Sequence, residues 1–357
     1  VVFVGGGNQV FFHGIPYSPE DAPWPGWLFY ASTHMGPNGG LWHDLPAFNG
    51  YLQRCQSVLQ SGKPDSEVLL YFPFSDLIHD GAEKLPLFTV HNQADWLHPT
   101  PFYQAAMEMW NQGITFDFVS DDLLKPASVR DGKIVLGNNE FKVLVIPAAT
   151  MVPEATLREI ARLKDSGGRI EFFYFDKPPV PDVPGFLNFE ERRGAAKEMM
   201  LKNRFGYRSG KLKSILGNRH DVKSETMVRS GLRFVRRKHA DGFHYFIVNR
   251  SGKEFDGSIK LATRFKSAVV LNPWRPDFQA VVSTPEIPIR LAASQSMILR
   301  TFNDRKLEGP AWIFTDTDSL EVPLAGPWKL EFINGGPELP KDFEIASPVS
   351  WISLPDS

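Results

Sequence analysis

The chain has 357 residues, of which 42% are hydrophobic, and its 39 Lys and Arg against 41 Asp and Glu give a formal net charge of −2. This length is enough for two or three domains with buried cores. Because the sequence has no basic run of five or more residues and no apolar run of roughly 18, it predicts neither a nucleic-acid partner nor membrane insertion. The single cysteine, Cys55, excludes an internal disulfide and a multi-cysteine metal site.

The N-terminal region predicts a strand, a long loop and a helix. The apolar runs "VVFV" and "QVFF" flank Gly5–Gly7 and lead to His13 and Gly14, a pattern typical of a buried strand. The segment "FFHGIPYSPEDAPWPGWLFYAS", Phe11–Ser32, follows as an aromatic loop interrupted by prolines. In "DLPAFNGYLQRCQSVLQSG" apolar residues then recur every three or four positions up to Gly62, which predicts an amphipathic helix.

The next region alternates short apolar runs with helical patterns. The runs "EVLLYFPF", "ITFDFV", "KVLVIPAA" and "RIEFFYF" predict strands. Between them, Thr100 and Pro101 open a predicted helix that ends at Gly113, and "PEATLREIARLKDSGG" is a second. Because helix-length crossovers favour parallel pairing, residues 63–190 are predicted to form one open, doubly wound α/β domain with a mainly parallel sheet.

The rest of the chain changes character. Residues 191–230 are polar and mixed and are predicted to be a helical linker. In residues 231–303 short alternating runs are separated by turn residues, which predicts an antiparallel β domain. Residues 304–357, with "GPWKLEFINGGPELPKDF", are interpreted as the start of a further, truncated β-sandwich, and Val1 as a cut end because it carries neither Met nor a signal-like region.

Several residue patterns lack the neighbouring elements or the spacing that their usual functions require. Gly5–Gly7 are followed by a strand-like run rather than a helix, and no glycine-rich turn follows "VLLYF" or "VLVIP", so we expect no nucleotide cofactor. Cys55 lies mid-helix on the apolar face, where a buried inert thiol is commoner than a nucleophile. His91, Asp95 and His98 match no known metal-site spacing, and we name no metal ligand.

The aromatic loop is the candidate binding region. A strand that ends in a polar residue and leads through a long loop to a crossover helix is how active-site walls are built at the C-terminal face of a barrel. Sugar C–H faces pack on indole and phenol rings, and imidazole and phenol groups hydrogen-bond hydroxyls. The candidate substrate-binding residues are therefore His13, Tyr17, Trp24 and Trp27. The alternative is structural, with Trp24 and Trp27 clamping the loop to the domain behind it.

Several stretches resemble one known family. "GGNQVFFHGIPYSPEDAPWPGWLFYAS", "LPAFNGYLQRCQSVLQSGKPDSEVLLYFPFSD", "LFTVHNQADWL" and "GITFDFVSDDLL" are similar to the second half of glycoside hydrolase family 106, the α-L-rhamnosidases. The resemblance covers residues 5–175, and more loosely the β region. It implies the last strand and helix of a (β/α)8-type barrel at 1–62, a flavodoxin-like domain, an antiparallel β domain and the start of a galactose-binding-like sandwich.

The resemblance also implies a chemistry: inverting hydrolysis of terminal α-L-rhamnosides in plant or bacterial polysaccharides, with calcium helping to hold the sugar. Inversion needs a general acid and a general base, and these are expected upstream of Val1, since Glu20, Asp21 and Asp44 match no catalytic position. We accordingly expect an exported protein, periplasmic or extracellular. A non-catalytic carbohydrate-binding or scaffold fragment, and another exo-glycosidase such as a β-galactosidase, are the alternatives.

Overall fold

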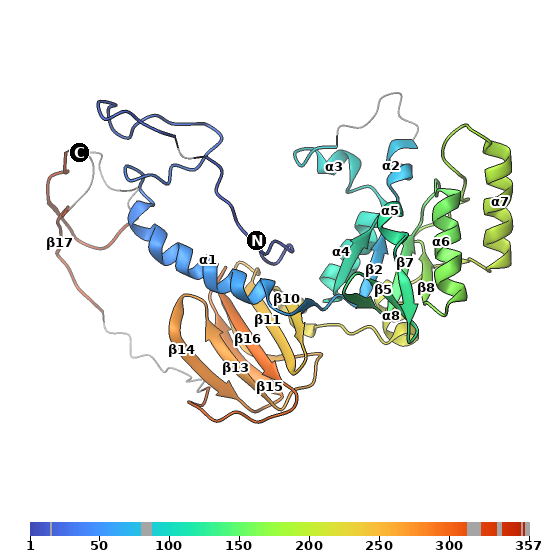
Figure 1. The fold of residues 1–357 in the computed structure, drawn as a ribbon. Coiled ribbons are helices and arrows are strands. Elements are labelled where there is room, and N and C mark those ends of the chain that lie inside the picture. The colour runs from blue at the N-terminus through green and yellow to red at the C-terminus, as the bar shows by residue number, and fades with distance from the viewer. Residues whose placement is uncertain (15, 80–87, 313–322, 334–337, 351–352, 354–357) are drawn as a thin grey trace. The chain divides into compact units, whose positions relative to one another are not determined.

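The computed structural model describes residues 1–14, 16–79, 88–312, 323–333, 338–350 and 353. They form a mixed α/β protein with several sheets (Figure 1). The chain divides into two compact units, the first made of Val1–Asn8 and Arg54–Trp312 and the second of Gln9–Gln53 and Ile313–Ser357. Each unit is described by itself. Among the described residues no helix is both long enough and apolar enough to cross a bilayer.

The first unit contains a five-stranded parallel sheet in the order β3-β2-β7-β8-β9. Its strands are β2 (Val68–Tyr71), β3 (Phe116–Val119), β7 (Val143–Pro147), β8 (Ile170–Phe173) and β9 (Tyr207–Arg208). Counted along the chain this order is 2-1-3-4-5, one of the two common orders of doubly wound sheets. The prediction that the four apolar runs pair in one parallel sheet is confirmed.

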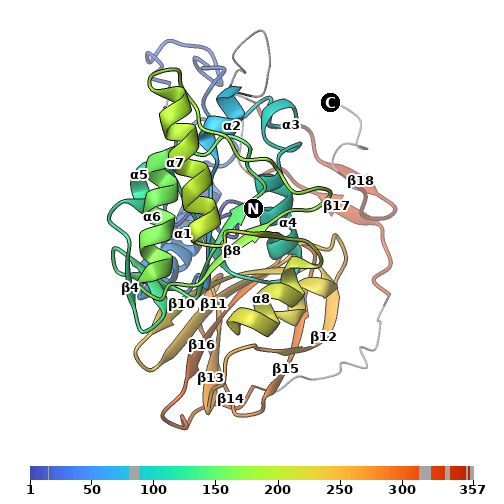
Figure 2. The same cartoon turned by 90° about the vertical axis from the view of Figure 1, so that its right-hand side faces the viewer.

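Helices cover both faces of this sheet because alternate side chains of each strand point to opposite sides. Val68 and Leu70 of β2 pack with α4 (Pro101–Asn111) and α8 (Leu212–His220). Leu69 of β2 packs on the other face with α6 (Glu154–Asp165). There α5 (Asp121–Leu124) also lies, and α7 (Phe189–Lys202) runs beside α6 in both views (Figures 1 and 2). Thr100 caps α4 and Pro101 opens it, as predicted.

The α/β domain also contains a three-stranded antiparallel meander that the sequence analysis missed. It consists of β4 (Ser128–Arg130), β5 (Lys133–Leu136) and β6 (Asn139–Phe141). A two-residue turn with positive φ at Asp131 (52°) and Gly132 (72°) joins the first pair. Asp-Gly between apolar runs is a strong hairpin signal, so the sequence did contain the evidence for this element.

The segment 191–230, predicted as a linker, belongs instead to the α/β domain. It supplies most of α7, the edge strand β9 and all of α8. Leu212 and Leu216 of α8 are fully buried against the sheet. The polar composition misled the prediction because a helix that packs on one face needs few apolar side chains, and a two-residue strand has no periodicity to detect.

The strand pairs in both sheets of the β domain are antiparallel. The larger sheet has the order β1-β10-β11-β16-β13-β14 and the smaller pairs β12 with β15. The strands are β1 (Lys63–Pro64), β10 (Leu232–His239), β11 (Gly242–Asn249), β12 (Phe255–Lys260), β13 (Ser267–Asn272), β14 (Arg275–Val282), β15 (Glu286–Leu291) and β16 (Ser296–Phe302). Apolar side chains from both sheets fill the core between them, together with Met227 and Val228 of the 3-10 helix η2 (Thr226–Ser230).

Two N-terminal segments of the first unit, residues 1–8 and the second half of helix α1, also pack on the β domain. Phe3 is buried with its ring edge-on to Phe246, 5.7 Å between centroids. Arg54 Nε, in the second half of α1 (Leu45–Gln60), donates to the carbonyl oxygen of Pro273 at 2.5 Å. The structure therefore distributes the predicted segment 1–62 between two units. The predicted helix is confirmed as α1, but residues 8–14 form no strand among the described residues, because a strand needs a regular ladder of backbone hydrogen bonds and not single contacts.

The second unit contains the aromatic loop, the 3-10 helix η1 (Trp42–Asp44) and the first half of α1. Its C-terminal part has one antiparallel pair, β17 (Trp328–Leu330) with β18 (Phe343–Ile345). Most of the expected sandwich at 304–357 lies outside the described residues or in irregular structure. Residues up to Trp312 belong to the β domain, where the Trp312 indole N–H donates to the carbonyl of Pro288 at 2.7 Å.

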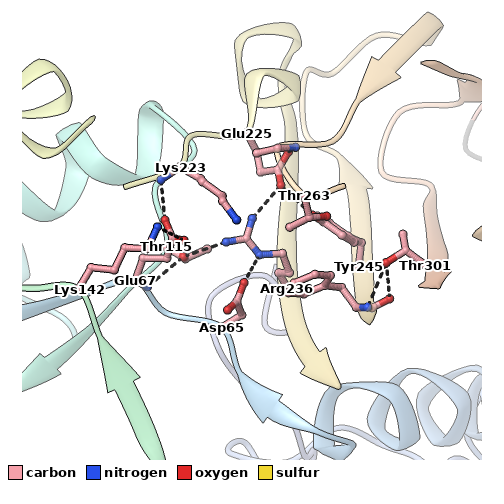
Figure 3. A network of polar contacts seen from close by, with 12 residues as sticks. Asp65, Glu67, Thr115, Lys142, Lys223, Glu225, Arg236, Tyr245, Thr263 and Thr301 are labelled. Carbon is pink, nitrogen blue, oxygen red and sulfur yellow. Dashed lines mark hydrogen bonds and ion pairs between the residues drawn. The ribbon is translucent and has the colours of Figure 1, made fainter. Parts of the chain in front are cut away.

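A buried ion-pair network joins β10 to the α/β domain (Figure 3). The Arg236 side chain is 1% exposed; its Nη1 donates to Glu225 Oε1 at 2.8 Å and its Nε to Asp65 Oδ2 at 2.5 Å. Glu225 is fully buried and also accepts the Tyr245 hydroxyl at 2.9 Å and the Ala262 N–H at 2.9 Å. Each buried charge is therefore paired, as burial requires.

A histidine pair on β10 and β11 predicts how stability depends on pH. His244 Nδ1 lies 2.9 Å from His239 Nε2, and burial, with His239 and Arg300 adding repulsion, lowers the pKa of His244 to about 4. Other groups facing it are Asp241, which opposes this shift, and Ser61, whose hydroxyl lies 3.2 Å from Nδ1.

A histidine of the unfolded chain binds a proton near pH 6.5. The contribution of neutral His244 to the free energy of unfolding is therefore complete above that pH and is lost as the pH falls towards 4. We expect His244→Phe to reduce the acid-induced loss of unfolding free energy between pH 7 and 4.5 by about 1–2 kcal/mol. The measurement is urea denaturation at several pH values, with the same substitution at exposed His91 as control. An unchanged slope in His244→Phe would contradict the assignment.

Candidate functional site

The aromatic loop places its four candidate residues at the surface of the second unit. Tyr17 is 86% exposed, and Trp24, Trp27 and His13 are exposed too. The His13 ring stacks near Phe29, 6.3 Å between centroids. Among the described residues no hydrogen bond or ring contact joins any two of the four. The structure thus brings none of them together, and their role stays a prediction.

One local contact orders the loop. The backbone N–H of Trp27 donates to Ser18 Oγ at 2.8 Å, and this bond ties the segment that carries Tyr17 to the segment that carries Trp27. Both indole rings nevertheless remain more than half exposed. Sugar contact and a structural clamp therefore both stay predictions for Trp24 and Trp27.

A cavity of about 790 Å³ lies at the carboxyl ends of the parallel strands. It is lined by the residues that directly follow β2, β7 and β8, by the first turn of α4, by α2 (Phe74–His79) and by α3 (Gln93–Trp96). We call it the carboxyl-edge cavity. It opens where the first and third strands of the 2-1-3-4-5 order lie side by side, which is the switch point at which doubly wound proteins bind ligands.

Aromatic side chains form the inner wall of the carboxyl-edge cavity. The Phe72 and Phe102 rings meet edge to face at 4.8 Å, and Phe102 is buried. Half-buried Trp96 is held by its indole N–H, which donates to the carbonyl of Thr89 at 3.0 Å. Phe175 completes this wall from the end of β8. The chain therefore offers flat apolar faces at fixed positions.

Polar side chains surround this wall at the rim. Asp95, Gln104, Asp176 and Lys177 are exposed and line the opening. Carboxylate and amide groups accept or donate hydrogen bonds to hydroxyls. Aromatic faces next to a few polar groups are the lining expected of a small-molecule pocket.

Asp76 has a structural role in the same cavity. One of its carboxylate oxygens accepts the N–H of Thr150 at 2.9 Å and the other accepts the N–H of Met151. These bonds hold the loop after β7 against α2. Since the oxygens are already engaged by backbone donors, Asp76 shapes the cavity rather than serving as a reactive group.

A cluster of two hydroxyls and one carboxylate lies at the carboxyl end of β2, at the same edge of the parallel sheet. Asp121 Oδ1 accepts the hydroxyls of Tyr71 and Thr156, each at 2.6 Å. Burial raises the pKa of Tyr71, and the negative charge of Asp121 raises it further; burial likewise raises the pKa of Tyr207. These phenols therefore stay neutral and act as hydrogen-bond donors at ordinary pH.

Sequence reasoning did not find this cavity, although it noted one of its residues. Asp95 lies at the rim, whereas His98 stacks on Tyr103 with 4.3 Å between centroids. Among the described residues no three His, Cys, Asp or Glu side chains converge as metal ligands. The signal that could have found the cavity is positional, since Phe72 and Phe175 lie at the carboxyl ends of two predicted runs.

Comparison with known proteins finds one solved structure with a similar fold over most of this chain. No family model matches the chain. The solved structure of a rhamnosidase from Novosphingobium sp. PP1Y superposes with a TM-score of 0.56 over 88% of this chain and 30% of that one, at 14% identity. The two share a fold. Similarity at this level establishes the fold and not the activity.

Two further comparisons are weaker. A protein of Formosa agariphila described as a putative β-glucuronidase is 24% identical over 254 residues, 68% of this chain and 19% of that protein. A β-galactosidase from Bacillus circulans sp. alkalophilus covers 75% of this chain and 46% of that one at 10% identity, with a TM-score of 0.43, too low to establish a common fold. The chain spans about a fifth of the curated relative and about a third of the rhamnosidase.

Proposed function

We propose that the chain is part of a glycoside hydrolase and that its carboxyl-edge cavity binds a sugar. The observation that carries this proposal is the lining of the cavity, in which Phe72 and Trp96 present aromatic faces beside the rim groups Asp95 and Asp176. Sugars present just these two surfaces, weakly apolar C–H faces and a ring of hydroxyls. The fold shared with a rhamnosidase over most of the chain supports the same choice.

We propose further that the whole protein is an exported enzyme that cleaves terminal α-L-rhamnosides by inversion. The resemblance to glycoside hydrolase family 106 in residues 5–175 supports this substrate and the accompanying barrel, flavodoxin-like and galactose-binding-like parts. In this proposal the acid and the base come from a part of the protein outside these 357 residues. Calcium that helps to hold the sugar remains part of this proposal, as the resemblance implies; among the described residues no three His, Cys, Asp or Glu side chains converge as metal ligands.

The aromatic loop is proposed as a second sugar-contacting surface. Exposed Tyr17, Trp24 and Trp27 offer ring faces, and His13 offers a hydrogen-bonding group beside them. Large exposed aromatics in one short segment mark an interaction surface. A barrel mouth would be the place where such a loop meets the substrate.

Sugar binding by the 357-residue chain tests this function. We expect intrinsic tryptophan fluorescence or calorimetry to detect L-rhamnose, and Asp95→Asn to raise its Kd about fivefold, since one hydrogen bond to a charged group is worth about 1 kcal/mol or more. Asp277→Asn is the matched control, because Asp277 is an exposed carboxylate of the β domain. His13→Ala in the same titration tests the loop.

Each outcome decides between the candidates. Tighter binding of D-galactose or D-glucuronate than of L-rhamnose would favour another exo-glycosidase. Equal affinity of Asp95→Asn and the wild type would show that the sugar does not bind in the carboxyl-edge cavity. No binding of any of these sugars would overturn the proposed function.

A further inference from the structure

A second cavity, of about 630 Å³, lies apart from the carboxyl-edge cavity and within the first unit. One wall is β1 with the residues that follow it, together with the end of β10. The other wall is the meander hairpin from β5 to β6. We call it the lysine groove. Its volume is in the range of pockets that hold small ligands.

The lining of the lysine groove carries an excess of positive charge. Six Lys or Arg residues line it against three Asp or Glu residues. The basic residues are Lys63, Arg130, Lys133, Lys142, Lys223 and Lys238, and the acidic ones are Asp65, Glu67 and Glu140. The whole chain has a net charge of −2, so this concentration of cations is a local feature.

All three acidic residues are already paired within the protein. Asp65 binds Arg236 at 2.5 Å, and Glu67 binds Lys142 at 3.0 Å and the backbone N–H of Lys223 at 2.5 Å (Figure 3). Glu140 binds Arg130 at 2.5 Å and Lys133 at 3.1 Å. None of the acids is left to neutralise the remaining cations.

Three lysines of the groove have no ion-pair partner among the described residues: Lys63, Lys223 and Lys238. Lys63 and Lys238 lie directly opposite each other in the register of β1 and β10, and both are exposed. Directly opposed like charges destabilise a strand pair. Such an arrangement becomes favourable when an anion lies between the two ammonium groups.

Neutral groups in the same groove suit a sugar. The half-buried ring of Phe243 lies in the lining, and the amides of Asn138 and Asn139 reach it from the meander. An aromatic face and two amides match the C–H face and hydroxyls of a pyranose ring. The buried Arg236 network, with Asp65 and Glu225, holds β10 beside the α/β domain and so fixes the separation of the walls.

We propose that the lysine groove binds an acidic oligosaccharide, with a carboxylate or sulfate group of the sugar chain held between Lys63, Lys238 and Lys223. The choice of a glycan rests on the proposed function, whereas the choice of an anion rests on the charges alone. The groove would then hold an acidic stretch of the glycan whose neutral residue is bound elsewhere on the same protein.

Calorimetry with the 357-residue chain tests this proposal. The probes are a galacturonate oligosaccharide, a sulfated galactan oligosaccharide and a neutral galactan oligosaccharide of equal length, with inorganic sulfate and a single-stranded oligonucleotide for comparison. We expect at least one acidic oligosaccharide to bind at least tenfold more tightly than the neutral one, and less tightly at 200 mM than at 50 mM NaCl. The acidic probe that binds identifies the anionic group.

The double variant Lys63→Gln with Lys238→Gln should weaken that binding about tenfold. The matched control is Lys253→Gln with Lys306→Gln, which removes the same charge from two exposed lysines. Equal affinity in the two double variants, or equal affinity for acidic and neutral probes, would overturn the proposal. Tighter binding of the oligonucleotide than of either acidic probe, or of inorganic sulfate alone, would overturn the glycan assignment.

The same titrations separate this proposal from the proposed function. Loss of rhamnose binding in Asp95→Asn with retention of acidic oligosaccharide binding locates the two ligands in separate cavities. If acidic probes bind through Lys63 and Lys238 and no monosaccharide binds, the groove stands and the carboxyl-edge assignment fails. If rhamnose binds but no acidic probe binds through Lys63 and Lys238, only the lysine-groove proposal is overturned.

Discussion

Arg236→Met should lower the free energy of unfolding by about 3–5 kcal/mol, because it leaves the carboxylate of Glu225 without its cation in the protein interior. Arg236 is 1% exposed and Glu225 is fully buried. The remaining partners of Glu225, the Tyr245 hydroxyl and the Ala262 N–H, are neutral donors. They cannot replace the lost charge. Urea denaturation at pH 7 measures the effect.

A second variant keeps this prediction specific. Arg236→Met combined with Glu225→Gln removes both charges and retains an acceptor for Tyr245, so it should be clearly more stable than Arg236→Met alone. If the single and the double variant unfold at the same urea concentration, the loss comes from packing and not from the unpaired charge. A loss below about 1 kcal/mol in the single variant would show that water reaches Glu225.

Gly113→Ala should cost about 2–4 kcal/mol, from two causes that act at one position. Gly113 follows Gln112, the C-cap of α4, and has φ +69°. The Ile114 N–H bonds to the carbonyl of Met109 at 3.0 Å, and the Gly113 N–H to that of Trp110 at 3.2 Å, the pattern of a Schellman helix end. A Cβ there would also lie 2.2 Å from the backbone oxygen of Glu225.

Gly137→Ala is the matched control for this prediction. Gly137 has a similar φ of +57°, but nothing lies within 4 Å of the Cβ position. It should therefore lose only the cost of the left-handed conformation, about 1–2 kcal/mol. Equal losses at the two glycines, measured by urea denaturation, would mean that the Glu225 segment moves away at no cost and that its close approach to Gly113 is not required.

These two predictions concern the same junction. The Glu225 N–H donates to the carbonyl of Gly113 at 2.9 Å, while the Glu225 side chain binds Arg236. The segment that carries Glu225 is thus fixed to α4 through its backbone and to β10 through its side chain. Glycine at position 113 permits the first contact, and the ion pair makes the second.

The sequence by itself determined the elements whose signals are local. The four apolar runs became strands of one parallel sheet because short apolar runs separated by helix-length crossovers favour parallel pairing. The cap at Thr100, the helix start at Pro101 and the end at Gly113 follow from the backbone groups that each residue satisfies or the φ it allows.

Only the tertiary structure decided where non-local partners meet. The run before His13 has the composition of a strand, yet residues 8–14 form no strand among the described residues, because a strand needs a regular ladder of backbone hydrogen bonds that a distant segment must supply. The carboxyl-edge cavity joins Phe72 and Asp176, which are far apart in the chain. Lys63 and Lys238 likewise become neighbours through the register of two strands. Such pairs depend on long-range packing, and the periodicity of a short segment does not contain that information.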